Sequence, residues 1–235
     1  YTAAMLKAMA ASPTLIAAVD EGLLSLDDHA ADWLPSWQSD QLRSQITLHD
    51  LAFHASGMDD VDFDAGQAGE LPGWKQRYYD HPEERFRLAV DSAEILFAPG
   101  DHFSYSGVGF YVLSYIVTEA LQRRSVGQDI PAFLGDEVYG PLGLPRRVWR
   151  IGYARSDTID GLPLTHFGSG GELTARAAAR IGQLFLQRGC WRGTQLLEAD
   201  LVDTMLGRHG VTRLVTSGDE RAGPAPGGGW WVNVD

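Results

Sequence analysis

The stretch AAMLKAMAASPTLIAAVD at residues 3–20 decides the fold of this chain. Its large apolar residues offer more than one face at helical spacing, which is typical of a helix buried inside a core rather than lying on its surface. Pro13 predicts a kink or a break within the helix, and Gly22 predicts its end. We therefore expect a buried helix near the start of the chain, with these residues inside: Met5, Leu6, Met9, Leu15, Ile16 and Val19.

Lys7 lies within this apolar stretch, although lysine is rare in the chain. The sequence contains 19 lysines and arginines together, and only Lys7 and Lys75 are lysines. Burial disfavours the charged form of a lysine, so its pKa falls and the amine can accept a proton near neutral pH. The alternative is a lysine whose ammonium reaches the surface from a helix end. Taken alone, this placement leaves both interpretations open.

Composition limits the kind of protein and the kind of ligand. A chain of 235 residues that is 44% hydrophobic can bury a large core, and we expect one compact unit. A formal net charge of -12 argues against nucleic acid and anionic membrane surfaces as partners, because polyanions are repelled. Small molecules are the expected ligands. The single cysteine, Cys190, excludes an internal disulfide and a cysteine-based zinc site.

The ends of the chain give further expectations. No run of roughly 18 apolar residues is evident, so we expect no membrane span. The first four residues lack the charged start of a secretory signal, and the strand-like stretch at 228–235 stops abruptly. We expect one domain over residues 1–235 that is incomplete at both ends, with terminal strands missing.

Local signals predict the elements between these ends. Thr47 and Asp50 form an N-cap pattern for a short helix that ends near Gly57. Residues 59–84 are acidic, aromatic and without a sustained period, which predicts a long surface loop. Helical spacing returns over 108–124, so Tyr105 lies just before a helix. Thr174 is expected to cap a last helix over 175–188.

Several motifs follow one another in an order that resembles a known family. The stretch ITLHDLAFHASGM at 46–58 is similar to a segment ending in His-Thr-Ser-Gly, and PGDHFSYSG at 99–107 is similar to Pro-Gly-x-x-Phe-x-Tyr-Ser-Asn. Together with Ala4-Met5-Leu6-Lys7 and GGELTAR at 170–176, they resemble the β-lactamase, penicillin-binding protein and esterase superfamily of serine hydrolases, in its class C β-lactamase-like branch. The resemblance extends over nearly the whole chain.

The resemblance implies a fold and a reaction. The implied fold class is α/β (α+β), an antiparallel sheet flanked by helices with a mostly helical subdomain, of which this chain would supply chiefly the helical part. The implied reaction is hydrolysis of a small-molecule ester, amide or β-lactam through an acyl-enzyme, without a cofactor. In the family a serine one helical turn before the lysine is the nucleophile, and the lysine and tyrosine transfer protons. The implied catalytic positions are Ala4, Lys7 and Tyr105.

This chain departs from the family pattern in four ways. Ala4 occupies the nucleophile position and has no oxygen with which to attack a carbonyl. Gly107, the expected substrate-binding position, replaces an asparagine, and no third motif of the type Lys-Thr-Gly or His-x-Gly follows Trp231. The interval from Lys7 to Gly22 is one residue longer than is usual.

The alanine has three explanations and leaves more than one function open. It is an engineered substitution, a natural inactive member, or the sign of a modified serine missing between Ala4 and Met5. The expected function is that of a serine hydrolase whose nucleophile position is occupied by Ala4; the alternative is a catalytically inactive, β-lactamase-like binding protein. A helical interaction module without a site is the third interpretation, and the ordered motifs count against it.

Other residues that could carry chemistry have simpler explanations. His54 belongs to a structural turn in the resemblance, and the remaining histidines lack the His-x-x-x-His spacing of a metal site. The aspartates between 59 and 64 lack the spacing of a calcium loop, so they predict a solvated loop. We therefore expect no metal.

Overall fold

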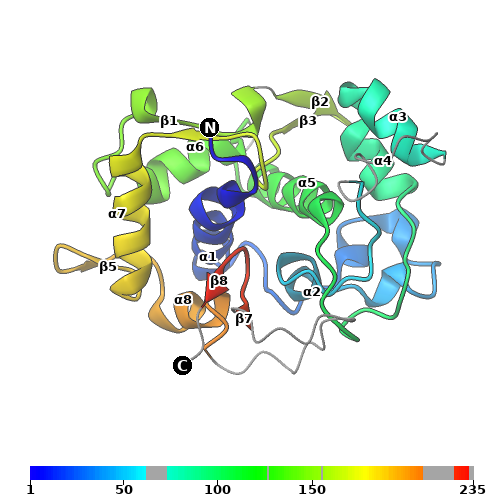
Figure 1. Cartoon of the computed structure of the whole chain (residues 1–235), viewed down its shortest axis with the longest axis horizontal. Coiled ribbons are helices and arrows are strands. Elements are labelled where there is room, and N and C mark those ends of the chain that lie inside the picture. Colours follow the sequence, from blue (N-terminus) through cyan, green and yellow to red (C-terminus); the bar gives the residue numbers. More distant parts are fainter. Residues whose placement is uncertain (62–72, 126, 155, 209–224, 233–235) are drawn as a thin grey trace.

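The computed structural model describes residues 1–61, 73–125, 127–154, 156–208 and 225–232. Within these ranges the chain is mostly helical (Figure 1). The α-helices are α1 (Ser12–Asp20), α2 (Leu48–Ala52), α3 (Trp74–Asp80), α4 (Arg85–Asp91), α5 (Gly107–Arg124), α6 (Ile130–Leu134), α7 (Ala175–Leu186) and α8 (Ala199–Met205). The short helical turns between them are η3 (Ala30–Asp32), η4 (Pro35–Trp37), η5 (Arg43–Gln45), η6 (Pro82–Glu84), η7 (Gly135–Tyr139), η8 (Arg146–Val148) and η9 (Gly152–Ala154).

The predicted helix over residues 3–20 is present, and it changes type along its length. It begins as the 3-10 turn η1 (Ala3–Met5), continues as the π-helix η2 (Lys7–Ala11) and ends as α1. A π-helical turn holds one residue more than an α-helical turn, which accommodates the long interval after Lys7. Pro13 lies near the start of α1, directly after the π-helix, and has no N–H to donate to the Met9 carbonyl four residues earlier. The Tyr139 hydroxyl donates to that carbonyl instead, at 2.6 Å.

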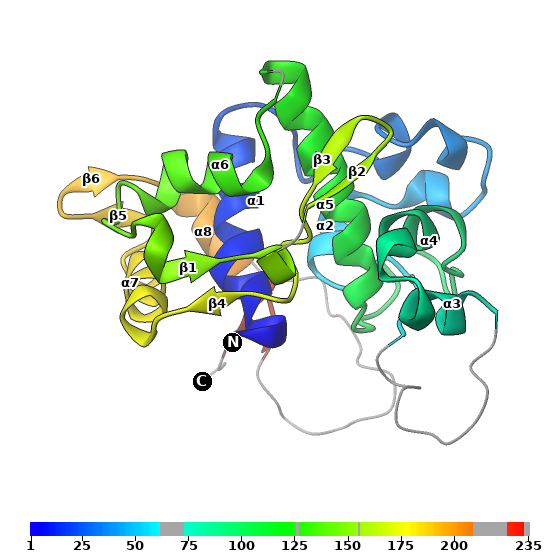
Figure 2. The ribbon, with the colours of Figure 1, turned by 90° about the horizontal axis from the view of Figure 1, so that it is seen from above.

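This helical stretch occupies the middle of the molecule, between α7 on one side and α5 on the other (Figures 1 and 2). Ala3–Asp20 is long and apolar enough, by length and composition, to cross a membrane, and 72% of it is buried inside the protein. The expectation that no such run exists is therefore corrected: its many alanines raise the mean hydropathy. Its burial is that of a core helix.

The strands form short antiparallel pairs. β1 (Trp149–Arg150) pairs with β4 (Glu172–Leu173), and β2 (Asp157–Ile159) pairs with β3 (Leu162–Leu164). β5 (Cys190–Trp191) pairs with β6 (Thr194–Gln195), and β7 (Ala225–Pro226) pairs with β8 (Trp231–Val232). The mixed α/β class and the antiparallel pairing are as predicted. Among the described residues no strand joins a sheet of more than two strands, so this part of the chain supplies chiefly helices.

The two predicted helix caps, at Thr47 and Thr174, are confirmed, and the structure adds a third at Ser106. Thr47 and Asp50 form a reciprocal capping box at the start of α2. The Ser106 hydroxyl accepts a hydrogen bond from the Gly109 N–H at the start of α5, and Thr174 accepts one from Ala177 at the start of α7. These caps satisfy N–H groups that a helix otherwise leaves without partners.

The predicted loop over residues 59–84 is partly wrong. Residues 62–72 lie outside the described part, and Trp74–Asp80 form α3. Lys75 and Tyr78, three positions apart, share one face of α3 and are both buried. The Lys75 ammonium lies 2.7 Å from the Asp59 carboxylate, so an ion pair joins α3 to the segment that ends at Val61.

Candidate active site

Lys7 points from the π-helix η2 toward α5 and is only 4% exposed. Its Nζ donates a hydrogen bond to the Tyr105 hydroxyl at 2.6 Å and another to the Gly168 carbonyl at 3.2 Å. The same nitrogen lies 4.7 Å from the centre of the Tyr105 ring and 5.0 Å from that of Phe110. The lysine therefore does not reach the surface, and the alternative of an exposed ammonium is wrong.

Tyr105 is held in place through its two neighbours in the chain. The Ser104 N–H donates to the His54 carbonyl at 2.8 Å, and the Ser106 N–H donates to His54 Nδ1 at 3.0 Å. The His54 ring also stacks on the Tyr105 ring, with centroids 4.5 Å apart. His54 has a positive φ of 58°, an uncommon conformation that places its backbone and ring on the same short segment.

His54 is neutral in the folded protein. Burial, together with the charge of Lys7, lowers the pKa of its ring from 6.5 to about 3. Because Nδ1 accepts the Ser106 N–H, the single ring proton of the neutral form lies on Nε2. His54 is thus a fixed support for Tyr105 rather than a proton carrier at neutral pH.

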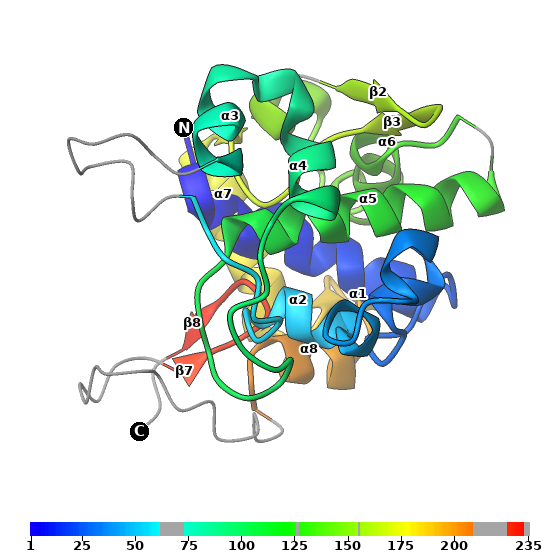
Figure 3. The ribbon, with the colours of Figure 1, turned by 90° about the vertical axis from the view of Figure 1, so that its right-hand side faces the viewer.

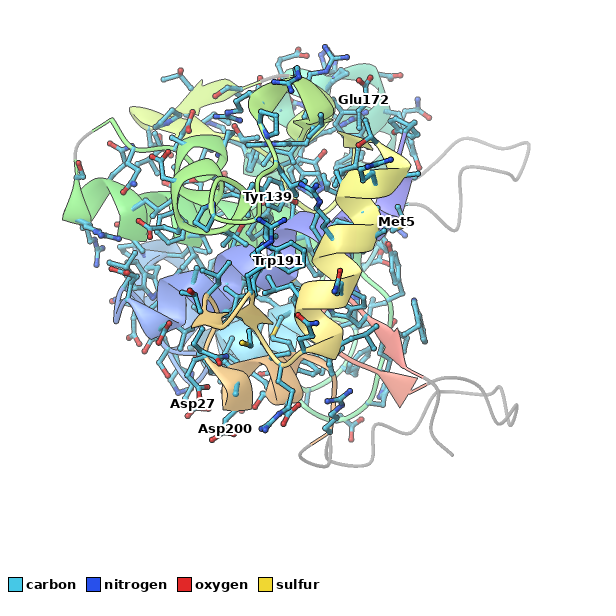
Figure 4. All side chains as sticks on the ribbon, turned by 90° about the vertical axis from the view of Figure 1, so that its left-hand side faces the viewer. Met5, Asp27, Tyr139, Glu172, Trp191 and Asp200 are labelled. Carbon is cyan, nitrogen blue, oxygen red and sulfur yellow. The ribbon has the colours of Figure 1, made fainter. Side chains whose placement is uncertain are left out.

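One cavity of about 420 Å³ opens onto the lysine and the tyrosine. Its walls come from the N-terminal helix, from the segments around His54 and Tyr105, and from the β7–β8 hairpin, which lies beside them in Figures 1 and 3. Met5, labelled in Figure 4, was expected inside the core, but it is half exposed because it lines one wall of the cavity. The lining residues are Ala4, Met5, Lys7, Ala8, Met9, His54, Phe103, Tyr105, Gly227, Gly229, Trp230 and Trp231.

Ala4 lines this cavity together with Lys7 and Tyr105, so the structure brings the three predicted catalytic positions to one place. Gly107 takes a different position. It lies at the first residue of α5, where its N–H donates to the buried Asp60 carboxylate at 3.0 Å. It is not among the described residues that line the cavity, and its role in substrate binding stays a prediction.

Sequence reasoning missed the aromatic wall and the carbonyl that holds Lys7. Trp230 is anchored by a hydrogen bond from its Nε1 to the Ser12 hydroxyl at 3.1 Å, and Trp231 packs edge-on against Phe103. No sequence motif assigned Gly168 to the site. A Cβ on Gly168 would lie 2.6 Å from Phe110 Cβ, so the backbone approaches Phe110 too closely for any other residue. The glycine in the sequence was the signal that could have indicated this close approach.

Potential metal ligands gather away from this cavity. Among the described residues, His81, Glu83 and Glu84 place one ligand atom each within 4.8 Å of one another on the surface. Glu84 already pairs with Arg77. Asp59 and Asp60, expected on a solvated loop, instead accept bonds from Lys75 and Gly107, and the aspartates at 62 and 64 lie outside the described residues.

The mixed α/β fold and the buried lysine beside a tyrosine at the wall of a cavity agree with the resemblance to β-lactamase-like proteins. A family model described as beta-lactamase matches residues 2–234. The chain therefore belongs to the beta-lactamase family. No curated protein sequence matches the chain.

Solved structures similar to this chain have the same fold. A penicillin-binding protein from Bacillus halodurans is 20% identical with a TM-score of 0.64, covering 99% of this chain and 70% of its own. EstCE1, a hydrolase with promiscuous acyltransferase activity, is 19% identical with a TM-score of 0.65, covering 99% and 68%. A D-stereospecific amidohydrolase from Streptomyces sp. is 20% identical with a TM-score of 0.62, covering 97% and 69%. The chain spans only 60%, 52% and 58% of the length of three other matching structures.

Proposed function

We propose that this protein carries the site of a serine hydrolase that acts on a small ester or amide through an acyl-enzyme, with Ala4 at the nucleophile position. The observation that carries the proposal is the 2.6 Å hydrogen bond between Lys7 and Tyr105 beside Ala4 in one cavity. An alcohol becomes a good nucleophile only when a neighbouring group takes its proton. A serine at position 4 would have such a group one helical turn away.

Each residue has a distinct role in this proposal. Lys7 accepts the proton of the attacking alcohol, and Tyr105 passes a proton to the leaving group. His54 supports Tyr105 through the backbone on both of its sides. The apolar wall of the cavity would hold the acyl group, because burying apolar surface is favourable at roughly 25 cal/mol per Å². β-Lactams remain within the same reaction class, and the fold alone does not choose among these substrates.

Ala4 itself supports a second candidate, a binding protein that holds an acyl or amide ligand without cleaving it. A methyl group at this position supplies no oxygen for an acyl bond, so the chain with Ala4 is not expected to turn over an ester. The two candidates share one cavity and differ by one atom. Restoring that atom separates them.

The test compares the Ala4→Ser variant with the parent chain in hydrolysis of p-nitrophenyl butyrate. We expect a burst of p-nitrophenol followed by turnover in the variant and neither in the parent, because the added hydroxyl lies beside an existing base. Ala8→Ser is the matched control: it places a hydroxyl elsewhere in the same cavity and should stay inactive. A folded Ala4→Ser protein that cleaves no ester leaves the binding candidate in its place.

A further inference from the structure

Lys7 has the surroundings of an amine nucleophile. It is 4% exposed, yet it lines the cavity, so a small molecule in that cavity meets it without passing through the protein. A lysine amine within reach of a bound carbonyl compound can form a Schiff base with it once a neighbouring group has taken its proton. In a serine hydrolase the serine reaches a bound carbonyl first. Here residue 4 is alanine, whose methyl side chain cannot attack the carbonyl.

Tyr105 supplies the proton transfers that such a reaction needs. Its hydroxyl lies 2.6 Å from Lys7 Nζ, a distance that allows direct proton transfer between the two groups. The two supports of the tyrosine, at Ser104 and Ser106, hold it in this position.

The cavity walls favour one kind of carbonyl compound. Phe103 and Trp231 form an edge-to-face pair with centroids 5.4 Å apart, and Trp230 lies on the same wall. Met5 and Met9 complete an apolar surface that can adapt to a flat ring. Aromatic groups pack well against such walls. A volume of about 420 Å³ is within the range of pockets that enclose small organic ligands.

We propose that Lys7 captures apolar aromatic aldehydes as a covalent imine, with Tyr105 as the acid and base of the condensation. This activity does not depend on a serine and goes beyond the proposed ester or amide hydrolysis.

The reaction is balanced with the residues present. The Lys7 nitrogen forms a bond to the carbonyl carbon, and the carbonyl oxygen takes the Tyr105 proton. The nitrogen then returns one of its protons to the Tyr105 oxygen, which leaves a neutral carbinolamine. In the second step the Tyr105 proton moves to the carbinolamine hydroxyl, the C–O bond breaks and water leaves. The nitrogen lone pair forms the C=N bond, and the last N–H proton restores the Tyr105 hydroxyl.

The small number of amines makes the test clean. Residues 1–235 include two lysines, Lys7 and Lys75, and a polypeptide of these residues also carries the α-amine of Tyr1. We would incubate the parent chain with 2-naphthaldehyde, trap the imine with sodium cyanoborohydride and map the modified peptides by mass spectrometry. The expected result is one adduct at Lys7, formed at least about tenfold faster than adducts at the other two amines. Modification only at Tyr1 or Lys75 overturns the proposal, and this readout needs no variant.

Variants and a second probe separate the proposal from simple lysine reactivity. Lys7→Met should lose the fast adduct, Tyr105→Phe should slow it by roughly 100-fold, and Lys75→Arg should leave it unchanged. Glyoxylate, a small anionic aldehyde, should label Lys7 at least about tenfold more slowly than 2-naphthaldehyde, with no such preference at the Tyr1 amine. Equal rates for the two aldehydes at Lys7 contradict a role for the aromatic wall.

This test is independent of the ester test. It uses the chain with Ala4, whereas ester cleavage is measured on Ala4→Ser. An adduct at Lys7 without ester cleavage by Ala4→Ser supports the imine proposal and rejects the hydrolase proposal. Ester cleavage by Ala4→Ser without an adduct at Lys7 supports the hydrolase proposal and rejects the imine proposal.

Discussion

Lys7 and Tyr105 are 98 positions apart in the chain and meet at 2.6 Å. Their meeting was expected because Lys7 lies in an apolar helix and because both residues belong to motifs that resemble the catalytic motifs of one family. The third partner, the Gly168 carbonyl, has no such signal, because any residue offers a carbonyl and only packing selects this one. At the residue scale, side-chain chemistry was readable and backbone partners were not.

The first residue-scale prediction concerns the Tyr105 hydroxyl. In the Ala4→Ser background, Tyr105→Phe should lower turnover of p-nitrophenyl butyrate by about 100- to 10,000-fold, because proton transfer is lost while the ring stays. The thermal midpoint should change little, since the ring still stacks on His54. Ester rates and thermal melts measured side by side decide this. An unchanged rate would reduce Tyr105 to a packing residue.

The second residue-scale prediction concerns pH and His54. Its folded pKa of about 3 lies below the unfolded value of 6.5, so the unfolded state binds the extra proton and stability falls as pH drops through this range. Lowering the pH from 7 to 5 should cost about 2 kcal/mol through His54. Burial also lowers the pKa of His166, which adds to the loss in the same direction.

His54→Asn tests this assignment. Asparagine tolerates a positive φ, and its side-chain oxygen can accept the Ser106 N–H. Urea unfolding at pH 7 and pH 5 should show a difference in unfolding free energy that is about 2 kcal/mol smaller in the variant than in the parent. The same pH dependence in both proteins would mean that His54 titrates normally.

At the scale of elements, the local sequence predicted helix N-caps and the glycines that end helices. It did not predict where a helix departs from regular α-helical geometry. Thr47 and Thr174 cap helices through bonds that span three positions, so local sequence suffices; the cap at Ser106 has the same spacing and was missed. The π-helix η2 is fixed from outside. The Tyr139 hydroxyl (Figure 4), from η7, donates to the Met9 carbonyl at 2.6 Å. A partner 130 positions away leaves no local pattern, and the same holds for α3, whose buried Lys75 pairs with Asp59.

The element-scale prediction concerns the segment that carries Gly168. In the Ala4→Ser background, Gly168→Ala should lower turnover by roughly 100-fold, because its Cβ would lie 2.6 Å from Phe110 Cβ and displace the carbonyl that holds Lys7. Gly182→Ala in α7 is the matched control, since nothing lies within 4 Å of its added Cβ. It should leave turnover unchanged and raise stability by up to about 1 kcal/mol. Equal turnover in the two variants would show that the Gly168 carbonyl has no part in the site.

At the scale of the whole molecule, the order of motifs along the chain indicated the family and the fold. It also indicated that the chain supplies mainly helices. Composition was less informative about the central helix. Its alanines allow close packing and also give it the hydropathy of a membrane span, and only its burial distinguishes a core helix from a membrane span. The aromatic wall of the cavity comes from residues 230–231, more than 200 positions from Lys7, and no local pattern links them.

The central claim is that Lys7 and Tyr105 form a proton-transfer pair beside position 4, and intact-protein mass spectrometry with a fluorophosphonate tests it most directly. The mass of the parent should first equal the value calculated from its sequence, because an additional serine between Ala4 and Met5 would raise it. The account predicts one adduct on folded Ala4→Ser and none on the parent or on Ala8→Ser. A folded Ala4→Ser protein without an adduct would contradict the claim.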